Sequence, residues 1–354
     1  MKIAFFIGSM ARGGAERVLS ILANHYIEKG WEVEIVMLLK NKVGYDLADK
    51  IKIIDMSGMN NSYLKNAGKW LMRIRGYLRS EKPDCVISFV ARINALVLTA
   101  SVGLKTKIIV SERNDPKHDG RSTVMQAYCD LLYRRSAGIV FQTKYEQSCF
   151  SDKVQKRGVV IPNPVSVDIK AKQGGHGVRI VTAGRLAEQK NQKMLIEAVY
   201  KISAGFPNLE CYIYGEGPLE QFLKDEIDKK GLNKVVFMPG NVKNIHEKIS
   251  EASVFVMTSN YEGLSNALIE AMMIGVPCIT TDYPGACELI IDKQNGKVVP
   301  CNDVDALAKA LVEILSNITL AKNYAEAAEI SASTYNTKVI LHKWDSFIEM
   351  VSMK

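Results

Sequence analysis

The chain has 354 residues, of which 47% are hydrophobic and 24% charged, a composition typical of a soluble globular protein with more than one domain. No stretch approaches the ~20 consecutive apolar residues that a transmembrane helix needs. The N-terminal segment MKIAFFIGSM has no small-residue cleavage site, so it predicts a first β-strand and not a signal peptide. Seven scattered cysteines without a C-x-x-C pair indicate a reducing compartment and exclude a disulfide framework.

The net charge of +8 is unevenly divided along the chain. Residues 1–165 carry 26 Lys and Arg against 15 Asp and Glu, a net of +11. Residues 166–354 carry 20 against 23, a net of −3. The first half is therefore expected to face an anionic ligand or surface, and the second half is not.

Short apolar runs alternate with helical patterns from the N-terminus onward. Before residue 158 the predicted strands are 2–8, 31–39, 84–90, 106–112 and 138–143, with helical segments between them, the first at 15–30. Residues 158–177 contain two prolines and then a polar stretch with Gly174, Gly175 and Gly177, and predict a linker. Beyond it the predicted strands are 178–185, 209–217, 234–240, 253–259 and 276–282, with helices at 191–202 and 219–231.

This alternation predicts an α/β protein with two doubly wound, Rossmann-like domains in tandem. The first is expected to span residues 1–165 and the second residues 166–334, and a final helix from about residue 335 to 354 is expected to cross back to the first. Ligands of such sheets bind where the strands end, so the loops that follow strands are the candidate sites, in a cleft between the two domains.

Two of these loops have the chemistry of an anion site. Gly13 and Gly14 follow the first strand and precede a helix, which favours either backbone N–H contacts to an anion or an ordinary tight turn. Arg185 and Lys190 lie in the loop GRLAEQKN (184–191), also ahead of a helix. Two cations there suit a diphosphate, and the alternative is a pair of solvated charges.

The segment YEGLSNALIEAM (261–272) places two carboxylates beside a helix start. Ser265 and Asn266 suit a helix N-cap, whose first-turn N–H groups form another anion site. Phosphates would repel Glu262 in the preceding loop, so we expect it to hold neutral sugar hydroxyls, and Glu270 to accept from the hydroxyls of a ribose. The alternative is a surface glutamate and a capping glutamate. The loop 282–290 is a further candidate for part of the phosphate-binding site.

Six segments, in order and spacing, resemble the retaining glycosyltransferases of family 4, which have the GT-B fold of two Rossmann-like domains facing across a cleft. They are GGAER (13–17), SERND (111–115), IPNPV (161–165), GRLAEQKN (184–191), YGEGP (214–218) and EGLSNALIEAMMIGVPCITTDYPGACELI (262–290).

The resemblance implies roles for individual residues. Arg185 and Lys190 would neutralise the donor diphosphate, and Glu262 would contact the donor sugar; these are the predicted catalytic residues. The remaining predicted donor-binding residues are Gly13, Gly14, Gly263 and Leu264, with Asn241 at the nucleobase, Ser265 and Asn266 at the diphosphate, and Glu270 at the ribose. Many relatives carry a histidine where this chain has Arg113, which is expected to contact the transferred sugar or an acceptor phosphate.

The implied reaction moves a sugar, with retention, from a nucleotide diphosphate donor to a hydroxyl of a lipid-linked saccharide. By analogy with the family the donor is a UDP-sugar, attack is from the front face, and no cofactor, metal or nucleic acid takes part. The sequence DVD (303–305) mimics a metal-binding D-x-D but precedes a helical pattern, which favours an N-cap.

Two other functions remain open at this point: a nucleotide-sugar 2-epimerase of the same fold, and a non-catalytic nucleotide-sugar-binding protein. A nicotinamide oxidoreductase is disfavoured because neither half has the G-x-G-x-x-G glycines.

Residues 62–82 form a basic amphipathic pattern with Lys65, Lys69 and Arg73 on its cationic face. These three residues are expected to meet an anionic membrane surface or acceptor phosphates, with the protein peripheral on the cytoplasmic side of the plasma membrane. The alternative is an ordinary helix whose apolar face packs on the sheet and whose basic face is solvated.

Overall fold

Two parallel β-sheets organise the chain, one in each of two structural units. The computed structural model describes residues 1–11, 13–57, 63–172 and 178–353. Unit 1 comprises Met1–Pro164 and Thr337–Lys354, and unit 2 comprises Val165–Asn336. The α/β fold with two doubly wound Rossmann-like sheets agrees with the prediction from the sequence. The chain passes from unit 1 to unit 2 one residue before the predicted boundary.

The sheet of unit 1 has seven parallel strands in the order β3-β2-β1-β4-β5-β6-β7. Its strand order reverses between β1 and β4, the usual switch point of doubly wound sheets. The strands are β1 (Lys2–Ile7), β2 (Glu32–Met37), β3 (Lys52–Asp55), β4 (Cys85–Phe89), β5 (Lys107–Ser111), β6 (Gly138–Phe141) and β7 (Gly158–Val160).

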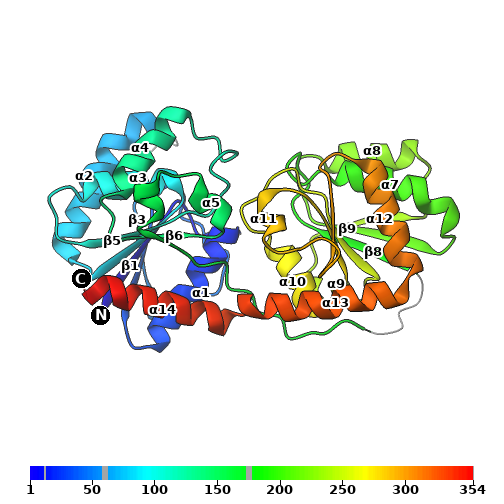
Figure 1. The fold of residues 1–354 in the computed structure, drawn as a ribbon. Helices are drawn as coiled ribbons and strands as arrows, with labels where there is room; N and C mark the ends of the chain where they lie inside the picture. Colours follow the sequence, from blue (N-terminus) through cyan, green and yellow to red (C-terminus); the bar gives the residue numbers. More distant parts are fainter. Residues whose placement is uncertain (12, 58–62, 173–177, 354) are drawn as a thin grey trace. The chain divides into compact units, whose positions relative to one another are not determined.

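Helices cover both faces of this sheet, with α2, α3 and α4 on one face and α1 and α14 on the other (Figure 1). The central strands are consequently buried on both sides and nearly all apolar, as in KIAFFI of β1. The helices are α1 (Gly14–Glu28), α2 (Tyr63–Glu81), α3 (Ala91–Ala100), α4 (Thr123–Tyr133), α5 (Lys144–Ser148), α6 (Asp152–Gln155) and α14 (Thr337–Met353).

The sheet of unit 2 has six parallel strands in the order β10-β9-β8-β11-β12-β13, so its switch point lies between β8 and β11. The strands are β8 (Val178–Ala183), β9 (Leu209–Tyr214), β10 (Val236–Gly240), β11 (Val254–Met257), β12 (Cys278–Thr281) and β13 (Lys297–Val299). The helices are α7 (Gln192–Ile202), η1 (Ser203–Gly205), α8 (Glu220–Lys229), α9 (Ile245–Ser250), α10 (Asn266–Ile274), α11 (Pro284–Cys287), α12 (Val304–Ser316), α13 (Ile318–Ala332) and η2 (Ser333–Tyr335).

The last helix, α14, belongs to unit 1, although the residues that precede it belong to unit 2. Trp344 and Ile348 of α14 are fully buried against β1 and β4 in the core of unit 1. Asp345 fixes the helix further by pairing with Lys29 of α1 at 2.9 Å and with His25 at 3.1 Å. The C-terminal segment is thus an integral part of the first unit.

Three strands are missing from the prediction. β3 and β13 are short edge strands, and the burial of β3 is too slight to produce an apolar run. β7 lies inside the segment predicted as linker and pairs in parallel with β6. The linker prediction was therefore wrong for residues 158–160, because the two prolines that suggested a break follow the strand and do not interrupt it.

The amphipathic pattern of residues 62–82 corresponds to α2. Its apolar residues Trp70, Ile74 and Leu78 are buried against β1 and β4, so this face belongs to the core, as the alternative interpretation required. Lys69 and Arg73 lie on the exposed side of α2. The side chain of Lys65 lies outside the described residues.

The DVD segment is a helix cap, as predicted. The Asp303 carboxylate accepts a hydrogen bond from the Ala306 N–H at 2.8 Å at the start of α12, and Asp305 pairs with Lys201. We expect Asp303→Ala to lower the free energy of unfolding by about 1 kcal/mol and Asp303→Asn to change it little, because asparagine caps equally well. Urea unfolding of both variants measures this, and equal losses would contradict the capping role.

Candidate functional site in unit 2

The predicted donor residues of unit 2 converge on one edge of its sheet. Arg185 and Lys190 follow β8, Asn241 follows β10 and Glu262 follows β11. In a parallel sheet these are all carboxyl ends, so the loops lie side by side, and those of β8 and β11 flank the switch point.

The loop after β8 is joined to the loop after β11 by a row of hydrogen bonds. The Asn260 N–H donates to the Gln189 carbonyl at 2.8 Å, and the Asn260 amide donates to the Glu188 carbonyl at 3.0 Å. In return the Gln189 amide donates to the Tyr261 carbonyl at 2.9 Å. Thr258 Oγ1 adds a bond to the Lys190 carbonyl at 2.9 Å. These bonds hold the two chain segments in fixed register.

The side chains of Lys190 and Glu262 meet where these loops join. Lys190 Nζ donates to Glu262 Oε1, and Ser259 Oγ donates to the same oxygen. The side chains are only 16% and 11% exposed, so water screens the pair weakly. Oε2 of Glu262 accepts no hydrogen bond within the described part of the chain. Oε1 is thus held by two hydrogen bonds, and Oε2 is available to a ligand.

Arg185 is exposed at the same edge, and its guanidinium makes no hydrogen bond or ion pair with any described residue. Its backbone is nevertheless fixed, because the Gln192 amide donates to the Arg185 carbonyl at 3.0 Å. A positive charge on a fixed backbone with a free side chain is suited to an anionic ligand.

The helix α10 begins at this edge with the predicted cap. Ser265 Oγ accepts from the Leu268 N–H at 3.4 Å, and Gly263 and Leu264 lead into it. A Cβ on Gly285 of α11 would lie 1.8 Å from the Gly263 carbonyl oxygen, so only glycine permits this approach. The loop after β12 therefore packs directly on the residues that lead into α10.

Glu270 is on the second turn of α10 and is 6% exposed. Its Oε2 lies 3.5 Å from Nε2 of His246 on α9, the helix that follows the exposed Asn241. His246 was not among the residues predicted from the sequence. The only feature of the sequence that could have indicated His246 is its position shortly after a strand end. The sequence spacing of residues does not reveal that α9 packs against α10.

The remaining predicted residues belong to unit 1. Gly13 is the N-cap of α1 and Gly14 is its first residue, so the helix begins one residue earlier than predicted. The Tyr45 hydroxyl accepts from the Gly13 N–H at 3.1 Å and donates to the Gly13 carbonyl at 2.8 Å. The N–H of Gly13 is therefore already bonded within the protein.

Arg113 lies in the interior of unit 1 and is only 7% exposed, in contrast to the expectation of a ligand contact. Its guanidinium donates to Ser111 Oγ at 2.8 Å and to Asn163 Oδ1 at 2.9 Å. It also lies 5.4 Å from the ring of Phe89 and 5.6 Å from that of Trp344. Burial lowers the pKa of Arg113 to about 10, which leaves the side chain charged at neutral pH.

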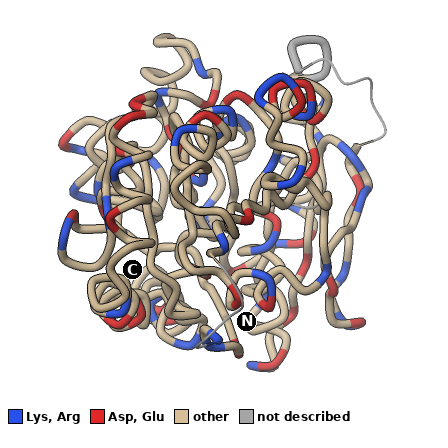
Figure 2. The backbone as a smooth tube through the Cα atoms, turned by 90° about the vertical axis from the view of Figure 1, so that its right-hand side faces the viewer, with Lys and Arg blue, Asp and Glu red and all other residues tan. Residues whose placement is uncertain are grey.

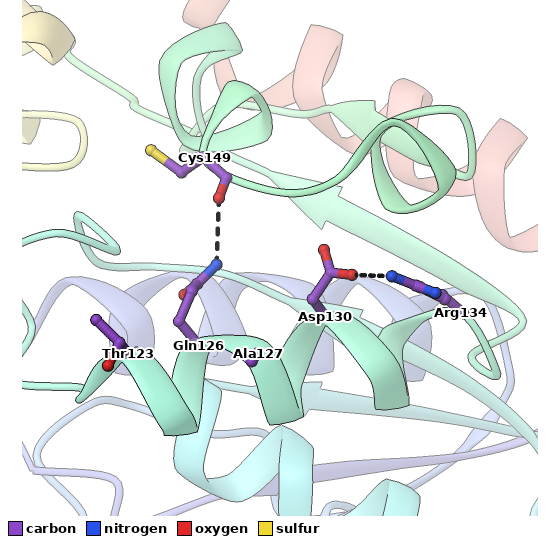
Figure 3. A pocket seen from close by; sticks show the side chains of 6 residues that line it. All are labelled: Thr123, Gln126, Ala127, Asp130, Arg134 and Cys149. Atoms are coloured by element: carbon purple, nitrogen blue, oxygen red, sulfur yellow. Dashed lines mark hydrogen bonds and ion pairs between the residues drawn. The ribbon is translucent and has the colours of Figure 1, made fainter.

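A pocket of about 420 Å³ in unit 1 contains none of the predicted residues (Figure 3). Its polar groups bond to one another: the Gln126 amide donates to the Cys149 carbonyl at 3.2 Å, and Asp130 pairs with Arg134 at 2.6 Å. Groups that are satisfied in this way offer little to a ligand, so the pocket is not the candidate site.

Lys and Arg positions are interspersed with Asp and Glu positions along the chain (Figure 2). The basic excess of residues 1–165 is therefore spread over many elements. Among the described residues, no three His, Cys, Asp or Glu side chains are grouped closely enough to hold a metal ion. No helix within the described residues combines the length and apolarity needed to cross a bilayer.

Both halves of the chain match models of known glycosyltransferases. Residues 12–169 match the model described as Glycosyltransferase Family 4, and residues 170–330 match the one described as Glycosyl transferases group 1. The chain belongs to glycosyltransferase family 4. The residue order and spacing that suggested this resemblance therefore gave the correct family.

Two relatives of this family 4 glycosyltransferase come from Campylobacter jejuni. One is 29% identical over 99% of both chains and is named GalNAc-α-(1→4)-GalNAc-α-(1→3)-diNAcBac-PP-undecaprenol α-1,4-N-acetyl-D-galactosaminyltransferase. The other, an N-acetylgalactosamine-N,N'-diacetylbacillosaminyl-diphospho-undecaprenol 4-α-N-acetylgalactosaminyltransferase, is 25% identical over 95% of this chain and 96% of its own.

Solved structures share the GT-B fold. HepE of Anabaena, in complex with UDP, matches 99% of this chain and 100% of its own with a TM-score of 0.84 at 17% identity. The lipopolysaccharide outer core galactosyltransferase WaaB, in its apo form, matches 99% of both chains with a TM-score of 0.79 at 19% identity.

Arg113→Lys is expected to lower the free energy of unfolding by about 2–4 kcal/mol, because an ammonium cannot bond Ser111 and Asn163 together while lying between two rings. Chemical denaturation measures this, with Arg73→Lys on the exposed side of α2 as the control. Unchanged stability combined with lost transfer would instead indicate a ligand contact.

Proposed function

We propose that this glycosyltransferase moves a sugar, with retention of anomeric configuration, from a UDP-sugar to a hydroxyl of a lipid-linked saccharide at the cytoplasmic face of the plasma membrane. The observation that carries the proposal is the Lys190–Glu262 pair at the switch point of unit 2, with the exposed guanidinium of Arg185 at the same edge. This set offers cations for a diphosphate and a carboxylate for sugar hydroxyls.

During the reaction negative charge develops on the leaving diphosphate, and the site must stabilise this charge. Arg185 and Lys190 supply positive charge, and the capped start of α10 adds the partial positive charge of a helix N-terminus near Ser265 and Asn266. In this scheme no metal ion is needed. Lys190 is held by Glu262 and Thr258 before any ligand arrives, so little reorganisation accompanies binding.

Glu262 orients the sugar in this proposal and is not a nucleophile. Its Oε1 already accepts hydrogen bonds from Lys190 and Ser259, and Oε2 remains for a sugar hydroxyl. A retaining hydrolase would need two carboxyl groups about 5 Å apart across the scissile bond. Front-face attack, in which the leaving phosphate oxygen takes the acceptor proton, requires only one oriented carboxylate.

Glu270 is proposed to accept from the ribose hydroxyls, with His246 fixing its orientation, and Asn241 to lie at the nucleobase. The UDP bound to HepE, a protein of the same fold, supports the choice of nucleotide. In unit 1, Gly13 and Gly14 at the start of α1 are proposed to let the donor approach closely, because neither residue has a side chain.

The names of the two Campylobacter relatives support the acceptor and the stereochemistry. Both names specify diphospho-undecaprenol-linked acceptors and an α linkage, and an α-linked UDP-sugar donor would give that linkage with retention. The exposed Lys69 and Arg73 of α2 are proposed to meet anionic phosphates of the acceptor or of the surrounding lipid. A panel of UDP-sugars incubated with extracted lipid-linked acceptors, with products read by mass, tests the reaction as a whole.

Arg185→Ala and Lys190→Ala are each expected to lower kcat by about 100-fold or more, because each removes a charge from the leaving group. The Arg185 side chain makes no hydrogen bond or ion pair with the described residues, so its variant should melt like the parent protein. The matched control is Lys193→Ala, which removes an exposed lysine of α7 in the same segment and should leave kcat unchanged. Intact turnover in Arg185→Ala, or turnover abolished by EDTA, would contradict the proposed neutralisation.

Glu262→Gln is expected to reduce transfer about 10-fold or more, since the amide loses the ionic contact with Lys190 and accepts more weakly from hydroxyls. No sugar should accumulate on the protein. Intact-protein mass spectrometry after incubation with the donor measures this. A mass increase of one sugar on the variant or the parent would show a covalent intermediate and refute front-face attack.

A further inference from the structure

The outward face of α4 carries an apolar stripe that the core of unit 1 does not use. Val124, Tyr128 and Leu131 are 77%, 40% and 59% exposed, and their i, i+4, i+7 spacing puts them on one side of the helix. The Tyr128 hydroxyl pairs with Thr99 Oγ1 of α3 at 2.7 Å. The polar end of this tyrosine is thus already satisfied, leaving the ring as an apolar surface.

The other faces of α4 are engaged within unit 1. Cys129, Leu132 and Tyr133 fill the core beneath the helix. The flank turned toward α5 carries Gln126 and Asp130, whose hydrogen bonds and ion pair are drawn in Figure 3. Val124, Tyr128 and Leu131 are therefore large apolar side chains of α4 that the described residues leave exposed.

The stripe belongs to a wider surface formed by α2, α3 and α4, which pack side by side over one face of the sheet (Figure 1). Met72 on the outer side of α2 is 69% exposed, and Val102, just past α3, is 42% exposed. Scattered exposed residues are normal, but five large apolar side chains over one three-helix layer are more than a soluble face needs.

The charges on this layer are almost all positive. Lys69, Arg73 and Arg79 are exposed on α2, and Arg134 and Arg135 are exposed where α4 ends. The three helices contain only two acidic residues: Asp130, already paired with Arg134, and Glu81, which contacts Lys2 at 2.7 Å. Apolar side chains among an excess of cations complement the boundary between the acyl chains and the phosphates of an anionic bilayer.

We propose that Val124, Tyr128 and Leu131 of α4, together with Met72 of α2, enter the headgroup region of an anionic lipid bilayer, while the flanking cations contact lipid phosphates. This deepens the proposed function and rests on it in one respect: a lipid-linked acceptor places the reaction at a bilayer. The proposed function has cations of α2 contacting phosphates. The new part is that apolar side chains of α4 enter the bilayer.

The test compares binding of the full chain to phosphatidylcholine vesicles with and without phosphatidylglycerol, measured by flotation. Val124→Ser/Leu131→Ser is expected to weaken binding to the anionic vesicles by about 10-fold, because each change removes apolar area from the interface. The matched control is Ile318→Ser/Ile330→Ser, which makes the same kind of change at residues of α13 that are 83% and 74% exposed. The control should bind like the parent.

Salt separates the two contributions. Lys69→Glu/Arg73→Glu is expected to remove most of the salt-sensitive part of binding, whereas the serine pair on α4 should remove the part that persists at high salt. As a second readout that keeps the stripe apolar, Leu131→Trp should shift its emission to the blue on anionic vesicles and be quenched by brominated lipid. Ile318→Trp should show neither change.

Unchanged vesicle binding by the serine pair, with no blue shift of Leu131→Trp, would overturn the proposal. Loss of self-association in the serine pair with vesicle binding intact would also overturn it and identify the stripe as a contact between two copies. Transfer to a water-soluble short-chain acceptor, assayed without vesicles, reports on the proposed function alone. This assay therefore distinguishes a failure of the proposed function from a failure of the membrane contact.

Discussion

The hydrogen-bonded union of two loops at the switch point of unit 2 is the constraint on which the site depends. Lys190 and Glu262 come from loops 72 residues apart in sequence, and neither side chain alone would hold its position. Asn260 and Gln189 fix the two backbones, so that the ion pair forms without ordering any further chain. The conformational entropy of these loops is thus lost during folding, and little more is lost when a ligand binds.

Glycine has a specific part in this assembly. A Cβ on Gly215 would lie 2.0 Å from the Gly184 carbonyl oxygen, and Gly215 also has a positive φ of 134°. The loops after β8 and β9 can therefore approach only if this residue has no side chain. Gly285 has the same function between the loops after β11 and β12, so backbone contacts connect the whole carboxyl edge.

Periodicity in the sequence was enough to predict two doubly wound sheets, because buried parallel strands are continuous apolar runs. It missed β3, whose residues are mostly exposed, and β7, whose three residues precede two prolines. The residues at strand ends were found because topology alone brings those ends together. The Asn260–Gln189 contacts and the approach of His246 to Glu270 depend on tertiary packing, which no local pattern records.

Arg113 shows how chemistry inferred from position can differ from the environment that folding provides. Arg113, a cation inside SERND at a strand end, was expected to contact a ligand. Its guanidinium instead bonds to Asn163, near the point where the chain leaves unit 1, and packs on Trp344 of α14. Arg113 therefore ties β5 to the segment by which the chain leaves unit 1 and to the helix by which it returns. The planar fork of donors on its guanidinium bridges Ser111 and Asn163, an arrangement that fits a positioning residue.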